Sequence, residues 1–377
     1  MKVYLDNAAT SYPKAPNFYE ETMELYKELG VNASRGKYSV AEKMLNIELD
    51  LRKKIANIFN ISNSKNVILS SSATVALNQI IQGIDYSDVK HVYISPFEHN
   101  AVYRPLLYMQ KQFGFKILQI PFNKFSWDKN KTKVLFESQK PDVVVMTHAS
   151  NVFGNILPVK EIFSMAKEYE SLNILDTAQT AGLLEINLKE LRVDFAAFAG
   201  HKSLYGPSGI GGFVINSNYV LKSILFGGTG INSEDVGMPS SYPERYEVGS
   251  MNSLAIIGLN TSLEWLLEKE IEKIRLQKIQ NFKKLISELS YFNEDIKLIY
   301  SDDNVGVLSC IFNDYSCQEM GLILDEAGIC TRSGLHCAPL AHKHIGTIDS
   351  GTVRFSLGYF NIQSEFNELN IILNSIF

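Results

Sequence analysis

The chain has 377 residues, a formal net charge of -5 and 45% hydrophobic residues, a composition typical of a globular protein with a large core. It contains no basic block of the kind that binds nucleic acid, and no apolar run of the roughly 18 residues that a membrane span requires. The first residues show no apolar leader, so we expect a cytoplasmic protein.

Short β-rich runs alternate with helical stretches through the first two thirds of the chain. Several of these runs are apolar throughout, as in strands of a sheet covered on both faces. Strand and helix in turn predict an α/β fold with a large domain, built on a mainly parallel seven-stranded sheet between helices. The predicted strands are residues 65–70, 90–96, 115–122, 141–148, 172–176, 193–200 and 211–216.

The pattern changes after about residue 250. Residues 253–290 read as one long helix that links two domains. Strand-like runs at 305–312 and 351–358, closed by a helix near 365–377, predict a smaller α+β C-terminal domain. The predicted boundaries are 16–250 for the large domain, and 1–15 with 251–377 for the small one.

Polar residues follow the predicted strands, at the edge of an α/β sheet where ligands bind. Ser71, Ser72, Ala73 and Thr74 open a helix, whose free N–H groups and hydroxyl could hold a phosphate, although ordinary helix caps have the same residue types. The other strand-end residues are His99, Asn151, Asp176 with Gln179, and His201 with Lys202.

Each of these residues also has a plain structural explanation. A lysine that ends a core strand can extend its amine to water, and a lone histidine is commonly structural. Together, however, a phosphate site, a histidine able to stack on a ring, an acid and a lysine match the needs of pyridoxal phosphate. The lysine forms the Schiff base, and the acid keeps the pyridine nitrogen protonated.

The sequence resembles the class V aminotransferase-fold enzymes, and within them the cysteine desulfurases and selenocysteine lyases, over essentially the whole chain. The motifs that carry this resemblance are THASNVFGN (147–155), LDTAQTAG (175–182), GHKSLYGPSGIGG (200–212) and RSGLHCAP (332–339). It implies pyridoxal 5'-phosphate as cofactor, bound covalently by Lys202. The other implied cofactor contacts are Asp176 at the ring nitrogen, Gln179 at the phenolic oxygen, His99 on the ring, Asn151 beside it, and Ala73, Thr74 and His201 at the phosphate.

The segment YEVGSMNS (246–253) resembles the family's segment that reaches into the partner subunit. The resemblance therefore implies a homodimer with shared active sites, in which Ser250 binds the neighbour's phosphate. Two positions depart from the family. Ala199 replaces a frequent serine ligand of the phosphate, and Asn100 stands where many relatives have a second histidine.

The fold itself hosts several reactions, so the cysteines have to distinguish them. Cys310, Cys317 and Cys330 lie in strand-like or helical surroundings and are expected to be small core residues. Cys337 lies in a turn-like stretch, where a thiol near cationic groups can become a nucleophile. Their spacings do not fit the ligand pairs of a zinc site, so we expect no metal.

We therefore predict a cysteine desulfurase that converts L-cysteine to L-alanine and leaves a persulfide on Cys337, with His99 transferring a proton at the substrate thiol. Arg354 is the first candidate for the substrate carboxylate, joined by Arg332 and Asn151. The short connection from Cys337 to Arg354 resembles the group II members, whose cysteine loop is short and ordered. It favours a sulfur-acceptor protein that comes to the site.

Two alternatives stay open. A selenocysteine lyase, or another class V aminotransferase or C–S lyase acting on a small amino acid, would use the same cofactor. Selenocysteine would then be the substrate, and its ionised selenol needs no cysteine nucleophile. A non-catalytic sulfur or metal carrier would use the C-terminal thiols and would leave Lys202, Asp176 and Thr74 without a role.

Overall fold

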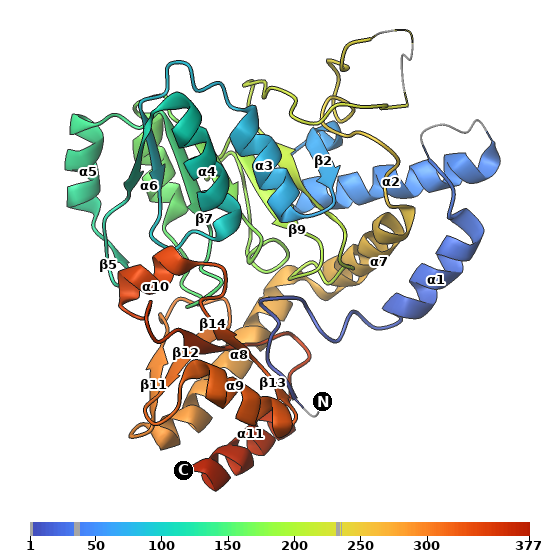
Figure 1. Cartoon of the computed structure of the whole chain (residues 1–377). Coiled ribbons are helices and arrows are strands. Elements are labelled where there is room, and N and C mark those ends of the chain that lie inside the picture. The colour runs from blue at the N-terminus through green and yellow to red at the C-terminus, as the bar shows by residue number, and fades with distance from the viewer. Residues whose placement is uncertain (1–2, 34–37, 231–233, 235) are drawn as a thin grey trace.

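The computed structural model describes residues 3–33, 38–230, 234 and 236–377, and its largest element is a seven-stranded sheet (Figure 1). The strand order is β2-β10-β9-β8-β7-β3-β4, with β10 antiparallel to both neighbours and the other pairs parallel. This confirms the predicted sheet, and each predicted run supplies one strand. The strands are β2 (Val67–Ser70), β3 (His91–Ile94), β4 (Lys116–Gln119), β7 (Val143–Thr147), β8 (Leu172–Asp176), β9 (Phe195–Ala199) and β10 (Gly211–Ile215).

Helices cover both faces of this sheet, which explains why its strands are apolar throughout. In β7, Val144 and Met146 belong to the core beneath α2, α6 and α7, while Val143 and Val145 belong to the core beneath α3 and α4. Successive side chains of a strand point to opposite faces, so every residue of β7 is buried. The helices of this part are α1 (Phe18–Leu29), α2 (Ser39–Ile58), α3 (Ala73–Gly83), α4 (Asn100–Phe113), α5 (Lys129–Ser138), α6 (Val159–Lys167) and α7 (Ser253–Lys269).

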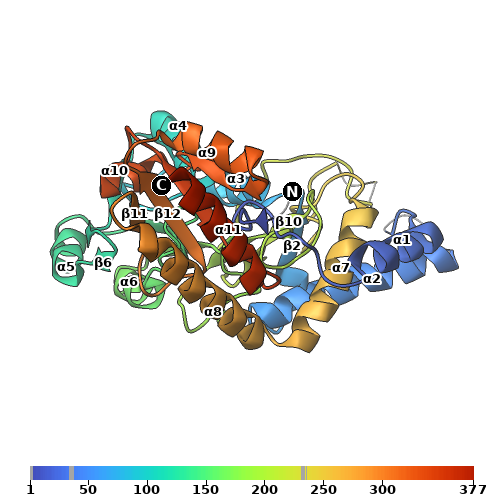
Figure 2. The same ribbon diagram turned by 90° about the horizontal axis from the view of Figure 1, so that it is seen from below.

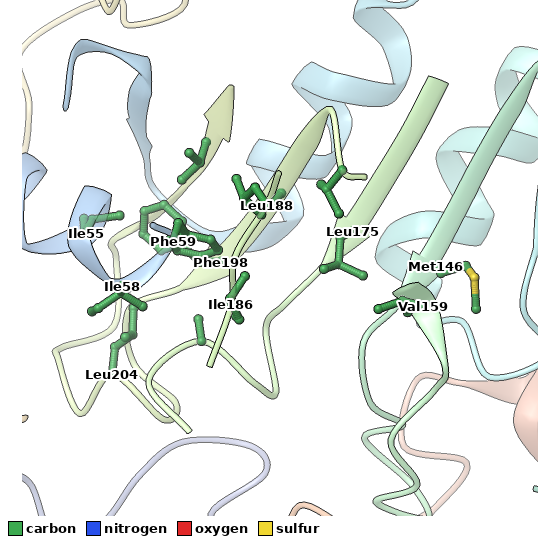
Figure 3. Close-up of a cluster of buried hydrophobic side chains, with 14 of the residues drawn as sticks. Ile55, Ile58, Phe59, Met146, Val159, Leu175, Ile186, Leu188, Phe198 and Leu204 are labelled. Atoms are coloured by element: carbon green, nitrogen blue, oxygen red, sulfur yellow. The ribbon is translucent and has the colours of Figure 1, made fainter. Parts of the chain in front are cut away.

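The core on the α2 side is centred on two phenylalanines (Figure 3). Phe59 follows α2 and Phe198 lies in β9, and their ring centroids are 5.9 Å apart. Both side chains are fully buried. Because the His201-Lys202 segment follows β9 directly, this packing fixes the strand that positions the lysine.

The C-terminal part forms a second, antiparallel sheet with the order β11-β12-β15-β14. The N-terminal strand β1 (Val3–Tyr4) pairs with β13 (Ile329–Cys330), so the chain start lies against this part. Figure 2 shows α8 and α11 side by side on it. The remaining elements are β11 (Ile296–Ile299), β12 (Val307–Phe312), β14 (Arg332–Gly334), β15 (Thr352–Ser356), α8 (Ile271–Leu289), α9 (Cys317–Glu326), α10 (Pro339–Ile345) and α11 (Gln363–Ile376).

Two predicted elements are divided in the structure. The single helix expected over 253–290 is α7 and α8, separated at Glu270, whose φ of 65° cannot continue a right-handed helix. The strand expected over 115–122 ends at Gln119. Ile120 N still donates to Ile94 O at 2.9 Å, and Pro121 follows. A separate hairpin of β5 (Phe122–Asn123) and β6 (Ser126–Trp127) follows. The domain boundaries given above stay a prediction.

No helix among the described residues combines the length and hydropathy needed to cross a membrane.

We expect Phe198→Ala to destabilise the protein by about 3–5 kcal/mol, because it empties a fully buried ring site beside Phe59. Val134→Ala is the control, since that side chain is 64% exposed on α5, and its effect should stay within about 0.5 kcal/mol. Guanidinium denaturation followed by fluorescence measures both. Equal midpoints for the two variants would contradict this account of the core.

Candidate active site

The predicted phosphate site lies at the start of α3. Ser72 caps the helix, its hydroxyl accepting a hydrogen bond from Val75 N at 3.2 Å. The adjacent strand β10 approaches closely at Gly211, where an added Cβ would lie 2.8 Å from the backbone nitrogen of Ala73. A helix start has N–H groups without intrahelical partners, and its dipole favours an anion. Glycine at position 211 therefore keeps the sheet against this helix start without covering it.

One cavity at the carboxyl ends of the parallel strands brings most of the predicted cofactor residues together. Ala199, one of the two positions that differ from the family, also lines this cavity. The family often has a serine there. Ser250, Arg332, Arg354 and Cys337 are not part of this lining. The predicted residues that line it are Ala73, Thr74, His99, Asn151, Asp176, Gln179, His201 and Lys202.

Lys202 and Asp176 influence each other's charge in this cavity. Burial lowers the pKa of the Lys202 amine to about 8, and the negative charge of Asp176 limits that fall. Burial raises the pKa of Asp176, although one of its oxygens accepts a hydrogen bond from Ala178 N at 2.9 Å. The amine is therefore available in its neutral, nucleophilic form much closer to neutral pH than an ordinary lysine.

His99 caps α4 with its ring. Its Nδ1 accepts a hydrogen bond from Ala101 N at 3.0 Å, so the ring proton of the neutral form lies on Nε2. Burial, helped by the cations Lys202 and Arg332, lowers the pKa of His99 to about 4. At neutral pH this ring is uncharged and presents an N–H donor.

The N-terminal segment contacts two residues of the cavity, and the sequence analysis did not identify these contacts. Gln179 donates its side-chain N–H to Ala8 O at 3.1 Å. Ser11 N and the Lys14 amine contact His201 O at 3.0 and 3.4 Å. Burial lowers the pKa of Lys14 to about 8. The signal that could have indicated these contacts is the motif YLDNAAT with the lysine after it, because both lie outside any periodic pattern.

The Cys337 loop is bonded to the loop after β7 and to the start of α4. Asn151 donates its side-chain N–H to His336 O at 2.7 Å, and Asn100 N donates to Cys337 O at 2.8 Å. His336 and Cys337 have φ values of 50° and 58°, a left-handed conformation that non-glycine residues seldom adopt. Arg332 places a guanidinium nitrogen 3.5 Å from the Cys337 sulfur.

A groove of about 600 Å³ lies beside the cofactor cavity. It runs along α3 and α4, and Cys337 lies in its wall. Thr74, His99 and Ala101 line both the groove and the cavity. The exposed Cys337 thiol and the half-buried Lys202 therefore line two adjacent hollows that share these three residues.

Arg354 lies beneath this site rather than on the surface. It is 1% exposed, donates to Asn151 O at 3.0 Å and forms an ion pair with Asp6, a residue to which the sequence analysis gave no role. Its Nε has no partner among the described residues. Arg332 is its direct neighbour across β14 and β15. Burial lowers the pKa of Arg354, while Asp6 counteracts that shift.

Ser250 and the other cysteines lie away from the cavity. Ser250 is exposed on the connection between β10 and α7, and its hydroxyl accepts a hydrogen bond from Asn32 at 3.1 Å. Cys310, Cys317 and Cys330 have thiols whose pKa is raised by burial. Within the described parts of the chain, no cluster of three or more His, Cys, Asp or Glu side chains is placed to hold a metal ion.

One buried ring nitrogen in the cavity is available to bind a cofactor. The Nδ1 atom of His201 is buried without a hydrogen-bond partner among the described residues, beside the helix start at Thr74. A phosphate at that helix start would meet free N–H groups, a hydroxyl and this imidazole. A buried acid and an amine with a lowered pKa complete the set of groups that a phosphorylated pyridine aldehyde requires.

Comparisons with known proteins agree over the full length. A family model described as Aminotransferase class-V matches residues 3–369. A probable cysteine desulfurase of Methanothermobacter thermautotrophicus is 30% identical, the alignment covering 99% of this chain and 94% of that protein.

Two solved structures have the same fold. The apo cysteine desulfurase of Thermococcus onnurineus NA1 superimposes with a TM-score of 0.91 at 26% identity, and Escherichia coli CsdA with 0.86 at 25%. Each comparison covers 99% of this chain and 94% of the other. The chain therefore belongs to the class-V aminotransferase family.

Proposed function

We propose that this chain is a pyridoxal-phosphate-dependent cysteine desulfurase, which converts L-cysteine to L-alanine and leaves a persulfide on Cys337. The observation that carries the proposal is the closeness of the thiol and the amine. The exposed Cys337 lines a groove and Lys202 lines the adjacent cavity, Thr74 and His99 line both, and the charge of Cys337 acts on the Lys202 amine. Relatives and structural neighbours named cysteine desulfurases support the same activity.

The cofactor would be held by the residues that line the cavity. Thr74 and the helix start would bind the phosphate with His201, Asp176 would pair with the ring nitrogen, and Lys202 would provide the covalent attachment. Bound pyridoxal phosphate supplies an electron sink for the bonds at the substrate Cα. His99 would stack on the ring, and Gln179 would donate to its phenolic oxygen.

The chain's own groups would bind the substrate and move its protons. Arg354, with Arg332 beside it, would bind the carboxylate, since a guanidinium matches two carboxylate oxygens. Asn151 would orient the substrate between them. Lys202 would remove the Cα proton as a base whose pKa is already low.

The sulfur then moves by a single displacement. The Cys337 thiolate attacks the substrate sulfur, so that a sulfur–sulfur bond forms and the substrate Cβ–S bond breaks. The electron pair of the broken bond leaves with the carbon fragment, which becomes alanine after protonation. His99 carries its proton on Nε2 and would transfer a proton at the substrate sulfur. Arg332 would stabilise the anionic sulfur of Cys337.

A homodimer with shared sites is the assembly we propose. Several exposed apolar side chains belong to α1, α2 and the β10–α7 connection that carries Ser250, elements that lie at the right and upper right of Figure 1. Exposed apolar surface of this kind is typical of a protein interface. Its larger members are Tyr19, Met23, Tyr38, Leu45, Leu49, Leu225 and Phe226.

A protein acceptor that comes to the site would receive the sulfur, because the Cys337 loop is short and bonded in place. We expect slow transfer from the persulfide to small free thiols. Complete transfer to such thiols without any protein would contradict this part of the proposal. We place the reaction in the cytoplasm.

Cys337→Ala should abolish formation of alanine and sulfide from L-cysteine, because no thiolate remains to accept the sulfur. The assay incubates the holoenzyme with L-cysteine and a reductant and measures both products. Cys330→Ala is the matched control, since that thiol is partly exposed but lies in β13 away from the groove, and it should keep wild-type turnover. Unchanged turnover in Cys337→Ala would contradict the desulfurase proposal.

The same variant separates the alternative activities. Selenocysteine turnover that survives in Cys337→Ala, together with weak cysteine turnover by the wild type, would favour a selenocysteine lyase. Consumption of a keto acid without sulfide would point to a transaminase instead.

The pH dependence of cofactor uptake tests Lys202. Only the free amine reacts with the aldehyde, so the uptake rate by apoprotein should rise with pH and level off above about 8, not near the ordinary value of 10.5. Rapid mixing followed by borohydride trapping and peptide mass mapping gives the rate. In Asp176→Asn the plateau should begin at lower pH, because the carboxylate that supports the protonated amine is gone. A rate that keeps rising up to pH 10.5 would contradict the assignment.

A further inference from the structure

A buried ion pair holds the loop that carries Ser250. Glu247 lies in the connection between β10 and α7 and Arg52 in α2, and their side chains are 9% and 3% exposed. The two terminal nitrogens of Arg52 contact the two carboxylate oxygens of Glu247 at 2.8 and 2.7 Å. This two-pronged contact fixes both the place and the orientation of the Glu247 carboxylate.

The same ion pair also forms hydrogen bonds to the backbone of the outer strand of the large sheet. β2 is the outermost strand on this side. Arg52 donates to Val67 O at 2.6 Å, and Glu247 accepts from Leu69 N at 2.6 Å. The ion pair thus satisfies the edge groups that an additional strand would use. Glu247 is thereby tied to α2 and β2 at once.

Only Val248 and Gly249 separate this anchor from Ser250. Before the anchor, the buried Tyr246 donates its hydroxyl to Leu221 O at 3.0 Å. After it, Gly249 N donates to Gly228 O at 2.8 Å. The exposed hydroxyl of Ser250 therefore stands at a short, fixed distance from the ion pair.

We propose that Glu247 is a positioning residue which, through Arg52, fixes Ser250 for the cofactor phosphate bound by the partner subunit. The inference rests on the proposed homodimer with shared sites. The alternative is that Ser250 binds the phosphate of its own subunit, since it also lines a hollow of about 390 Å³ with Ser70 and Ser71. Mixed dimers distinguish the two.

The first measurement compares two matched variants. Glu247→Gln should weaken pyridoxal phosphate binding by roughly tenfold, because the loop loses a charged contact. Glu48→Gln is the control. Glu48 contacts the same Arg52 at 2.7 Å and lies one turn away on α2. Because Glu48 is not on the loop, Glu48→Gln should leave cofactor affinity unchanged. Affinity is read from borohydride-trapped pyridoxyl label on Lys202 at graded cofactor concentrations.

The second measurement uses dimers of Glu247→Gln and Lys202→Ala subunits, isolated through two different tags. The Glu247→Gln homodimer binds weakly, and the Lys202→Ala homodimer takes no covalent label. In the mixed dimer, the surviving lysine faces an intact partner loop. We therefore expect half of the sites to bind with wild-type affinity.

Mixed dimers that stay at the Glu247→Gln affinity would overturn the inference, since Glu247 would then act on its own subunit. If Glu247→Gln fails to fold, Arg52→Lys is used with the same partner, and it should show the same recovery in mixed dimers. Ser250→Ala homodimers check the shared site itself. Wild-type affinity in Ser250→Ala, or a monomer by light scattering, would refute the shared-site proposal and not merely the role of Glu247.

Discussion

Two hydrogen bonds between the C-terminal loop and the segments that follow strands of the large sheet set the geometry on which the proposed chemistry depends. They run from Asn151 to His336 O and from Asn100 N to Cys337 O. Asn151 follows β7, and Asn100 opens α4 after β3. The segments at this edge of the sheet thereby hold both the lysine and, through these bonds, the thiol. Without them, the left-handed backbone at Cys337 would cost about 1–2 kcal/mol with nothing to maintain it.

Burial determines which groups of the site are charged. Lys202, Arg332 and Arg354 concentrate positive charge, and the same cations help to keep His99 neutral. Asp6 balances Arg354, and Asp176 supports the charge of Lys202. An anionic amino acid that enters this space meets cations held in place by carboxylates. Its amine meets a lysine that already loses its proton near pH 8.

The parts of the molecule that were predictable are those governed by local pattern. Strands such as β7 could be found because burial on both faces makes them apolar throughout, and parallel strands bring residues such as Asp176 and Lys202 to one edge. The contacts of Asp6 and Lys14 were not predictable, since they depend on the long-range pairing of β1 with β13. The break at Glu270 was missed because glutamate favours helices, and only its backbone conformation ends α7.

The fixed loop also constrains the fate of the sulfur. The carbonyls of His336 and Cys337 are bonded to Asn151 and Asn100, and these bonds restrain the backbone that carries the thiol. A persulfide formed there stays at the mouth of the groove between α3 and α4. Arg104 lines that groove as a further cation. The acceptor protein that we propose would therefore have to bring its own nucleophile into the groove, and an acidic surface around that nucleophile would complement Arg104 and Arg332.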